Sequence, residues 1–574
     1  MHFNALSVLA FAAASNAVIL DSAKVIGTST GRITKYLGIP YAKPPWVYSV
    51  LVWRTVVPTG SLALDLAQHR RPSPEASGTE QPVLWPGGFP IPTAVGSDVL
   101  DLFVNTSAKY LAEGRARWID AIPDSGPENE NCLSINVQVP SEATSSSRLP
   151  VLVWIYGGGF EAGTTRMYNG GPIVERSIDL GEPIIYVSMN YRLNAFGFLA
   201  GKEIRDAKVG NLGLHDQREA FRWVQKYIAK CVPSPFNDLF LLTGYSFGGD
   251  PQKVTIWGES AGAISVSLHM LTNGGNTNGL FRGAFMQSGA PIPVGDHSVG
   301  QKAYDAIVTG TGCTGAPDTL SCLRKVSYGA FKAAVANTPY IFSYQSLIQP
   351  YPPRVDGVFL TDHPQQLVKK GSVADVPFVT GGCDDEATMF SLSTLNVTTS
   401  KEFKEYIKTL WLPKASRYHL NKIMKLYPDD VEQGSPYDTG SLNALSPQFK
   451  RFASFQGDAI FQGPRRYFLQ QRAGRQNTWS YITKRLKWLP FLGSFHLSDL
   501  MYTYSSGELQ DYLIHFVNSL DPNGDVAQWP EYTPSSPNLL TFEDDLAGRP
   551  TLTKDTFRGK AIELLTQLLL ENPV

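Results

Sequence analysis

Short runs of apolar and β-branched residues alternate with helical patterns along most of the chain after Cys132. The runs predict strands, which cover residues 150–156, 183–190, 254–257, 283–287, 376–380 and 479–483. Between two of them, residues 215–230 place apolar side chains at helical spacing. Alternating strands and helices predict an α/β fold with a large, mostly parallel central sheet and helices on both faces. Functional residues are then expected just past the carboxyl ends of strands.

Residues 1–17 contain an apolar run that ends in small residues next to Val18. This pattern is typical of a secretory signal peptide and predicts a secreted, extracellular protein, although no Lys or Arg lies near Met1. A buried N-terminal strand or helix is the alternative. Residues 18–574 contain no repeat, no flexible linker and no stretch approaching the roughly 20 apolar residues that span a bilayer. They therefore predict a single large domain without a transmembrane segment.

Composition narrows the range of partners. Hydrophobic residues make up 43% of the chain and charged residues 18%, as in globular proteins with a large core. The formal net charge is −1, so no basic surface is expected to attract nucleic acid. The five cysteines can pair in an oxidising compartment, and their odd number leaves at least one thiol outside the intramolecular disulfides. Asn105 and Asn396 lie in Asn-X-Ser/Thr triplets and are candidate glycosylation sites.

The pattern Gly-X-Ser-X-Gly occurs three times, around Ser29, Ser246 and Ser260. A nucleophilic serine in this pattern needs a strand before the turn and a helix after it, so that the turn exposes the hydroxyl. Only Ser260 has both, because residues 254–257 are β-prone and residues 261–271 can form a helix. Ser260 is therefore the candidate nucleophile, and the other two serines are expected to lie in plain turns.

A glycine run, Gly157-Gly158-Gly159, follows an apolar predicted strand. Glycines let backbone N–H groups approach the oxyanion that forms when a serine attacks an ester. A phosphate-binding turn or a merely flexible loop is the alternative, but no nucleotide-binding spacing accompanies the run. The run therefore favours an oxyanion hole.

A serine nucleophile also needs a carboxylate and a histidine, which follow it in that order in this kind of fold. His496 follows a predicted strand, whereas His269 lies on the helix that leaves the serine turn and cannot fold back. The acidic run Asp384, Asp385 and Glu386 also follows a predicted strand, and spacing alone leaves its three members tied.

Longer motifs resemble the type-B carboxylesterase family, which includes cholinesterases and large fungal lipases. The motifs are Trp154-Ile155-Tyr156-Gly157-Gly158-Gly159-Phe160, Asn190-Tyr191-Arg192-Leu193, Gly213-Leu214-His215-Asp216-Gln217-Arg218, Val254-Thr255-Ile256-Trp257-Gly258-Glu259-Ser260-Ala261-Gly262 and Met286-Gln287-Ser288-Gly289. The resemblance covers nearly the whole chain and is strongest to fungal secreted lipases and esterases. It implies the α/β-hydrolase fold and hydrolysis of small-molecule or lipid esters, with neither cofactor nor metal, and it leaves room for transient contact with a lipid interface.

The resemblance also assigns roles to individual residues. It implies a catalytic triad of Ser260, Glu386 and His496, which breaks the tie between the acids. The same resemblance implies that the oxyanion hole is formed by Gly158, Gly159 and Ala261. It also implies that Ser288 supports the triad carboxylate and that Cys313 and Cys322 form a disulfide. The turn-rich loop between these two cysteines is itself suited to a short disulfide.

Two segments depart from the family pattern. Residues 46–74 belong to a stretch without resemblance, where the fungal lipases build a lid and a first disulfide loop, and Cys132 has no upstream cysteine to pair with. Residues 231–246 are an insertion before the nucleophile strand. We interpret both segments as translated introns from an imperfect gene model, which peptide mass spectrometry of the native protein would test. The alternatives to an active enzyme are a non-catalytic binding or adhesion protein of this fold, or an inactive product.

Overall fold

The structure is a computed structural model that describes residues 17–21, 23–42, 130–229, 247–505, 507–525, 527–544 and 549–574. Several predictions fall outside these residues: the signal peptide except Ala17, glycosylation at Asn105, the turn around Ser246, and both doubtful segments. The division into a signal peptide and one domain stays a prediction. Within the described residues, no helix is long and apolar enough to cross a membrane.

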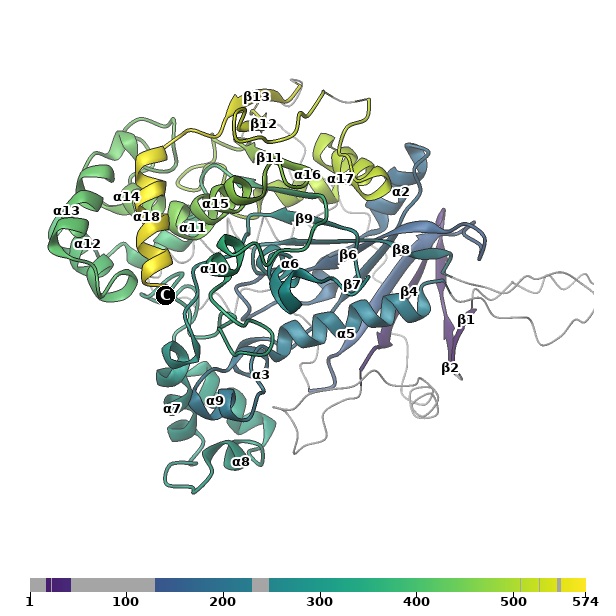
Figure 1. Ribbon diagram of the computed structural model, residues 1–574, viewed down its shortest axis with the longest axis horizontal. Coiled ribbons are helices and arrows are strands. Elements are labelled where there is room, and N and C mark those ends of the chain that lie inside the picture. The colour runs from purple at the N-terminus through teal and green to yellow at the C-terminus, as the bar shows by residue number, and fades with distance from the viewer. Residues whose placement is uncertain are drawn as a thin grey trace, which may run out of the picture.

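An 11-stranded sheet forms the centre of the molecule, in the order β13-β12-β11-β10-β9-β8-β6-β7-β5-β4-β3 (Figure 1). The neighbouring strands from β7 to β12 run parallel, and the strands at both edges are antiparallel. The strands are β3 (Thr28–Thr30), β4 (Ile33–Pro40), β5 (Ser134–Pro140), β6 (Leu149–Ile155), β7 (Ile185–Met189), β8 (Gly249–Glu259), β9 (Gly283–Gln287), β10 (Phe378–Cys383), β11 (Thr478–Thr483), β12 (Asn538–Phe542) and β13 (Thr551–Lys554). A separate two-stranded sheet pairs β1 (Ala17–Leu20) with β2 (Ala23–Ile26). The predicted α/β-hydrolase architecture is therefore confirmed.

The central strands are buried on both faces, as expected for a parallel sheet covered by helices. Every residue of β7, β9, β10 and β11 is buried. Consecutive residues of β8 show which helices cover which face, because neighbouring side chains of a strand point in opposite directions. Trp257 packs on Tyr504 of α16, with ring centroids 5.1 Å apart, whereas a side chain on Gly258 would collide with Gly262 of α6. Thus α16 and α6 cover opposite faces of the sheet.

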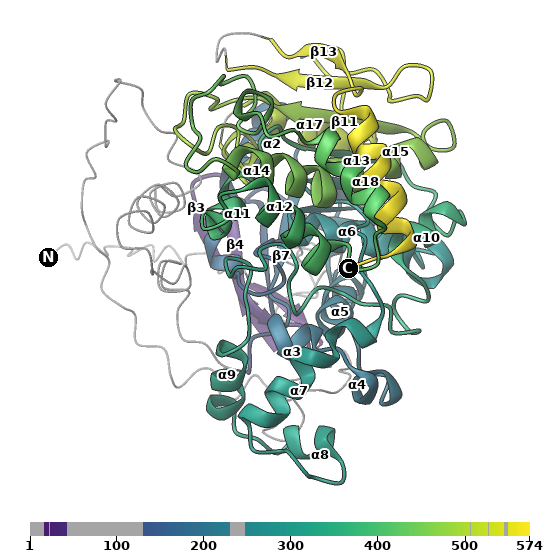
Figure 2. The same ribbon diagram turned by 90° about the vertical axis from the view of Figure 1, so that its left-hand side faces the viewer.

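The helices form two layers around the sheet and an additional group at one end (Figures 1 and 2). In that group α18 packs against α13 and α15 (Figure 2). The helices are α2 (Gly171–Asp179), α3 (Asn194–Phe198), α4 (Lys202–Asp206), α5 (Leu212–Tyr227), α6 (Ala261–Leu271), α7 (Gln301–Gly310), α8 (Thr319–Leu323), α9 (Tyr328–Ala336), α10 (Pro364–Lys369), α11 (Thr388–Ser391), α12 (Ser400–Tyr406), α13 (Arg417–Leu426), α14 (Phe449–Gly457), α15 (Gly463–Arg472), α16 (Met501–Tyr504), α17 (Glu508–Ser519) and α18 (Gly559–Glu571).

Several bounds differ from the sequence predictions, among them β10, which covers Phe378–Cys383 where residues 376–380 were predicted. The helix predicted over residues 215–230 is α5, which begins at Leu212. Strand β8 begins at Gly249, earlier than predicted, because Gly249 pairs with Leu149 of β6. The expectation that Ser29 lies in a plain turn is wrong, because it belongs to the exposed edge strand β3, which pairs with β4. Polar residues suit such an edge, since its side chains face water.

Candidate active site

Ser260 occupies the sharp turn between β8 and α6, at the carboxyl end of the strand. Its backbone has φ 55° and ψ −125°, a conformation that a residue other than glycine adopts only where the surroundings impose it. The Ser260 N–H donates to the Gln287 carbonyl at 2.9 Å, and the Ser260 carbonyl accepts from Ile264 N–H at 2.8 Å. The side chain is 7% exposed. These contacts hold the turn in place between strand and helix.

The glycines on either side of Ser260 are required by close packing. A Cβ on Gly258 would lie 2.4 Å from the carbonyl carbon of Gly262, and a Cβ on Gly262 would lie 1.9 Å from the Ile155 oxygen. Any larger residue would therefore push the turn away from β6. The spacing of the Gly-X-Ser-X-Gly pattern thus has a steric cause in this fold.

His496 and Glu386 form a buried pair close to this turn. Nδ1 of His496 lies 2.6 Å from Oε2 of Glu386, and the other carboxylate oxygen accepts from the Cys383 N–H at 2.8 Å. A backbone hydrogen bond of 2.9 Å from Asp385 to Ser494 brings the two loops together. With Nδ1 bonded to the carboxylate, Nε2 of His496 is the nitrogen that can take a proton. It makes no hydrogen bond within the described chain.

The three consecutive acids that spacing left tied point in different directions. Asp384 and Asp385 both contact Nζ of Lys487, at 2.6 and 2.7 Å. Only Glu386 contacts His496. Asp384 and Asp385 thus form a buried ion cluster with Lys487, whereas Glu386 pairs with His496. The order of the three acids along the chain does not predict this difference.

Glu259, the residue before Ser260, lies beside the histidine. Its Oε1 is 3.3 Å from Nε2 of His496, and both of its oxygens are buried without a hydrogen bond in the described chain. Burial, and then the nearby Asp499 and Glu386 carboxylates, raise the pKa of Glu259 well above its usual range. A protonated Glu259 adds no second negative charge next to the His496–Glu386 pair.

The glycine run after β6 exposes backbone donors. Gly158 and Gly159 have φ of +94° and +65°, and a Cβ on Gly158 would lie 2.1 Å from the Ala162 oxygen. Within the described residues, the N–H groups of Gly158, Gly159 and Ala261 donate no hydrogen bond. The Ala261 N–H opens α6, and the first N–H groups of a helix have no partner inside it. These donors are therefore available to an oxyanion.

The remaining predicted residues have varied surroundings. Ser288 is buried, and its Oγ lies beside Gly382 and Glu386 without a hydrogen bond in the described chain. His269 is buried and contacts Gln217 at 2.9 Å, away from Ser260, as expected.

The predicted disulfide between Cys313 and Cys322 is present, and Asn396 is exposed. Within the described residues, no cluster of His, Cys, Asp or Glu could hold a metal ion.

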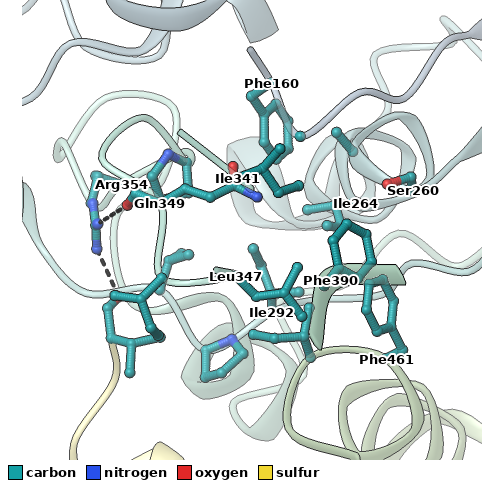
Figure 3. Close-up of a pocket in the computed structure, with 18 residues that line it drawn as sticks. Phe160, Ser260, Ile264, Ile292, Ile341, Leu347, Gln349, Arg354, Phe390 and Phe461 are labelled. Carbon is teal, nitrogen blue, oxygen red and sulfur yellow. Dashed lines mark hydrogen bonds between the residues drawn. The ribbon is translucent and has the colours of Figure 1, made fainter. Parts of the chain in front are cut away.

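Ser260 opens into a pocket (Figure 3). Most of the lining is apolar and comes from both helices and loops: Phe160, Ile264, Ile292, Ile341, Leu347, Phe390 and Phe461. Phe390 and Phe461 also pack on the His496 ring, with centroids 5.2 and 4.7 Å from it. The apolar wall of the pocket therefore lies next to both Ser260 and the ring of His496.

Two polar side chains in this wall, Gln349 and Arg354, were not identified from the sequence. They lie in an irregular segment without a motif, so no sequence signal marks them. Their position depends on packing between distant parts of the chain.

Comparisons with known proteins show the family of this chain. The model of the carboxylesterase family matches residues 105–558. Secreted triacylglycerol lipase LIP1 of Gibberella zeae is 37% identical, in an alignment covering 96% of this chain and 90% of the relative. Lipase 4 of Diutina rugosa is 38% identical, with 97% of each chain covered.

Among solved structures, Aspergillus niger EstA has a TM-score of 0.72 at 24% sequence identity, covering 97% of this chain and 99% of EstA. This likeness supports the same fold. The family match and the relatives spanning nearly the full length confirm the resemblance inferred from the motifs. The chain therefore belongs to the carboxylesterase family and is a carboxylic ester hydrolase.

Proposed function

We propose that this protein is a secreted esterase or lipase that cleaves carboxylic esters through Ser260, His496 and Glu386. The observation that carries the proposal is the buried 2.6 Å contact between His496 and Glu386 beside the strained Ser260 turn. Secretion is inferred from the signal-like N-terminus and from relatives named secreted lipases. The apolar pocket suits the acyl chain of an ester.

The chemistry is acyl transfer in two steps. His496 removes the proton from Ser260 as the hydroxyl attacks the ester carbonyl, and the N–H groups of Gly158, Gly159 and Ala261 stabilise the oxyanion. His496 then protonates the departing alcohol, leaving an acyl-enzyme. Water attacks this intermediate by the same route and releases the acid. Glu386 orients the imidazole and stabilises its positive charge while the proton is held.

Replacement of the serine tests the proposal. Ser260→Ala should lower kcat/KM for a p-nitrophenyl ester by about 10⁴-fold or more, because the nucleophile is lost. Ser29→Ala is a matched control, since Ser29 lies in the same sequence pattern but on the exposed edge strand β3. It should keep full activity. A fluorophosphonate probe should label the wild-type protein and fail to label Ser260→Ala.

Near-normal turnover by Ser260→Ala would refute the assignment. Absence of both turnover and labelling in the wild-type protein would instead support the alternative of a non-catalytic protein.

A further inference from the structure

The pocket that opens at Ser260 is apolar except at Gln349 and Arg354. Figure 3 shows Ser260 and Arg354 on opposite sides of the lining, with apolar side chains such as Leu347 and Ile292 between them. An acyl chain attached to Ser260 would run along these apolar groups toward Arg354. The far end of the pocket is thus chemically different from its middle.

The backbone of Arg354 is fixed from both sides by one buried side chain. Asn211 accepts a hydrogen bond of 3.0 Å from the Arg354 N–H and donates one of 2.8 Å to the Arg354 carbonyl. Nη1 of the guanidinium donates to the main-chain oxygen of Val574 at 2.7 Å. The residue is 5% exposed. These contacts hold Arg354 at the end of the pocket.

The guanidinium nevertheless keeps unused hydrogen-bonding capacity. Its Nε is buried and has no partner in the described chain, and Nη2 reaches the Gln349 carbonyl only at 3.5 Å. Burial lowers the pKa of Arg354 to about 10, so the group stays charged at neutral pH. A buried donor without a partner costs free energy, which a ligand atom or a water molecule can offset.

The free groups at this end are of two kinds. Nε of Arg354 is a donor and Oε1 of the Gln349 side chain is an acceptor, and neither has a hydrogen bond in the described chain. A hydroxyl group both donates and accepts, so it satisfies the two together. A methyl group satisfies neither, and a carboxylate satisfies only the donor.

We propose that the pocket binds acyl chains that carry a hydroxyl at the end distant from the ester, with Arg354 as the residue that selects them. This inference rests on the proposed role of Ser260. The reaction is unchanged: water cleaves the acyl–oxygen bond and releases an ω-hydroxy acid and an alcohol. Arg354 acts on substrate choice and takes no part in proton transfer.

The test compares p-nitrophenyl esters of three acyl series that end in methyl, hydroxyl or carboxylate, each over a range of chain lengths. At the length that reaches Arg354, the hydroxyl-ended ester should have a kcat/KM about tenfold above that of the methyl-ended ester, because a hydrogen bond to a charged group is gained. Shorter hydroxyl-ended chains should show no such gain, since they end among apolar residues.

Arg354→Met should remove this preference, so that the ratio of kcat/KM for hydroxyl-ended to methyl-ended esters falls to about one at every chain length. Arg475→Met is the matched control, because Arg475 is exposed and away from the pocket lining, and it should keep the wild-type ratio. The comparison of the three ester series with the wild-type protein tests the inference even if Arg354→Met fails to fold.

Two results would overturn the inference: a hydroxyl-to-methyl ratio that stays at or below one at every length, or a carboxylate-ended ester that exceeds the hydroxyl-ended one. Failure of the proposed function looks different, because all three series would then remain uncleaved.

Discussion

Buried carboxyl groups have different partners in two regions of the molecule. In the C-terminal part of the chain they pair with permanent cations: Asp555 contacts Arg465 and Arg466 at 2.8 and 2.7 Å, and Asp458 contacts Arg558 at 2.8 Å. Such pairs tie strand β13 and helix α18 to α15 and its neighbours. Removal of one partner would leave an uncompensated charge in the interior.

Around the candidate active site four carboxyl groups have no such partner, unlike Asp384 and Asp385, which contact Lys487. Within the described residues, Glu161, Glu259, Glu386 and Asp499 lie at ion-pair distance from no Lys or Arg. His496 is the basic side chain that contacts Glu386 and Glu259. A fixed cation would stabilise the carboxylate at all times and weaken its effect on the histidine. The contrast separates carboxyl groups that pair with fixed cations from carboxyl groups around the candidate active site that lack such a partner.

The two regions also titrate in opposite directions. Burial alone would raise the pKa of Asp555, but Arg465 and Arg466 bring it down to about 2. Burial raises the pKa of Glu161 to about 8, and the hydrogen bond from Ile341 N–H only partly opposes this. Substitutions in each region should therefore affect different measurements.

The largest effect is expected for Glu386→Gln. The amide cannot stabilise the imidazolium and favours the wrong histidine tautomer, so kcat should fall by about 10³- to 10⁴-fold. Unfolding by urea should change little, because the side chain keeps its size. Kinetics with a p-nitrophenyl ester measure the loss, and Glu405→Gln on α12 is the control. Retention of a tenth of the activity would argue against Glu386 as the triad acid.

A smaller effect, on stability alone, is expected for Asp555→Asn. It leaves two buried arginines without their carboxylate and should lower the free energy of unfolding by about 3–5 kcal/mol. In the wild-type protein this contribution is present above the unfolded-state pKa of about 3.9 and is lost as the pH falls toward 2. Urea unfolding between pH 3 and 7 measures it.

The rate per active site in Asp555→Asn, counted by fluorophosphonate titration, should stay at the wild-type value. A fall in that rate would mean that the ion cluster also shapes the active site, and the proposed separation would be wrong.

An effect on stability of similar size and opposite sign is expected for Glu161→Gln at alkaline pH. The folded protein holds the Glu161 proton up to a pH of about 8, while the unfolded chain releases it above about 4.3, so wild-type stability falls as pH rises between these values. The variant lacks this slope and should exceed the wild-type stability by up to about 5 kcal/mol at pH 8, because each pKa unit corresponds to about 1.4 kcal/mol. Urea midpoints from pH 5 to 9 measure the difference. Parallel curves for the two proteins would contradict the raised pKa.

Much of the fold could be predicted because its strands and helices produce local patterns of apolar and polar residues. Buried parallel strands must be apolar throughout, so runs such as residues 283–287 mark their strands to the residue. The turn at Ser260 was distinguishable from its two copies because a strand and a helix must flank it. Ends set by distant pairing, such as the start of β8 opposite Leu149, were not readable.

Local sequence patterns do not predict the contacts of the acidic run 384–386 or the polar residues of the pocket. Asp385 and Glu386 are adjacent and chemically alike, and only the surrounding loops place Lys487 beside one and His496 beside the other. Arg354 carries no motif at all, and its place in the pocket depends on contacts with Asn211 and Val574.

The sequence by itself determined the strand and helix periodicity, the family and the serine turn, because each depends on residues close together along the chain. Residue spacing left open which acid contacts the histidine, and the family resemblance supplied that acid and the candidate backbone donors. Tertiary structure alone decided which polar groups close the pocket. These depend on side chains from segments that are far apart in sequence, and no spacing rule encodes the contacts between them.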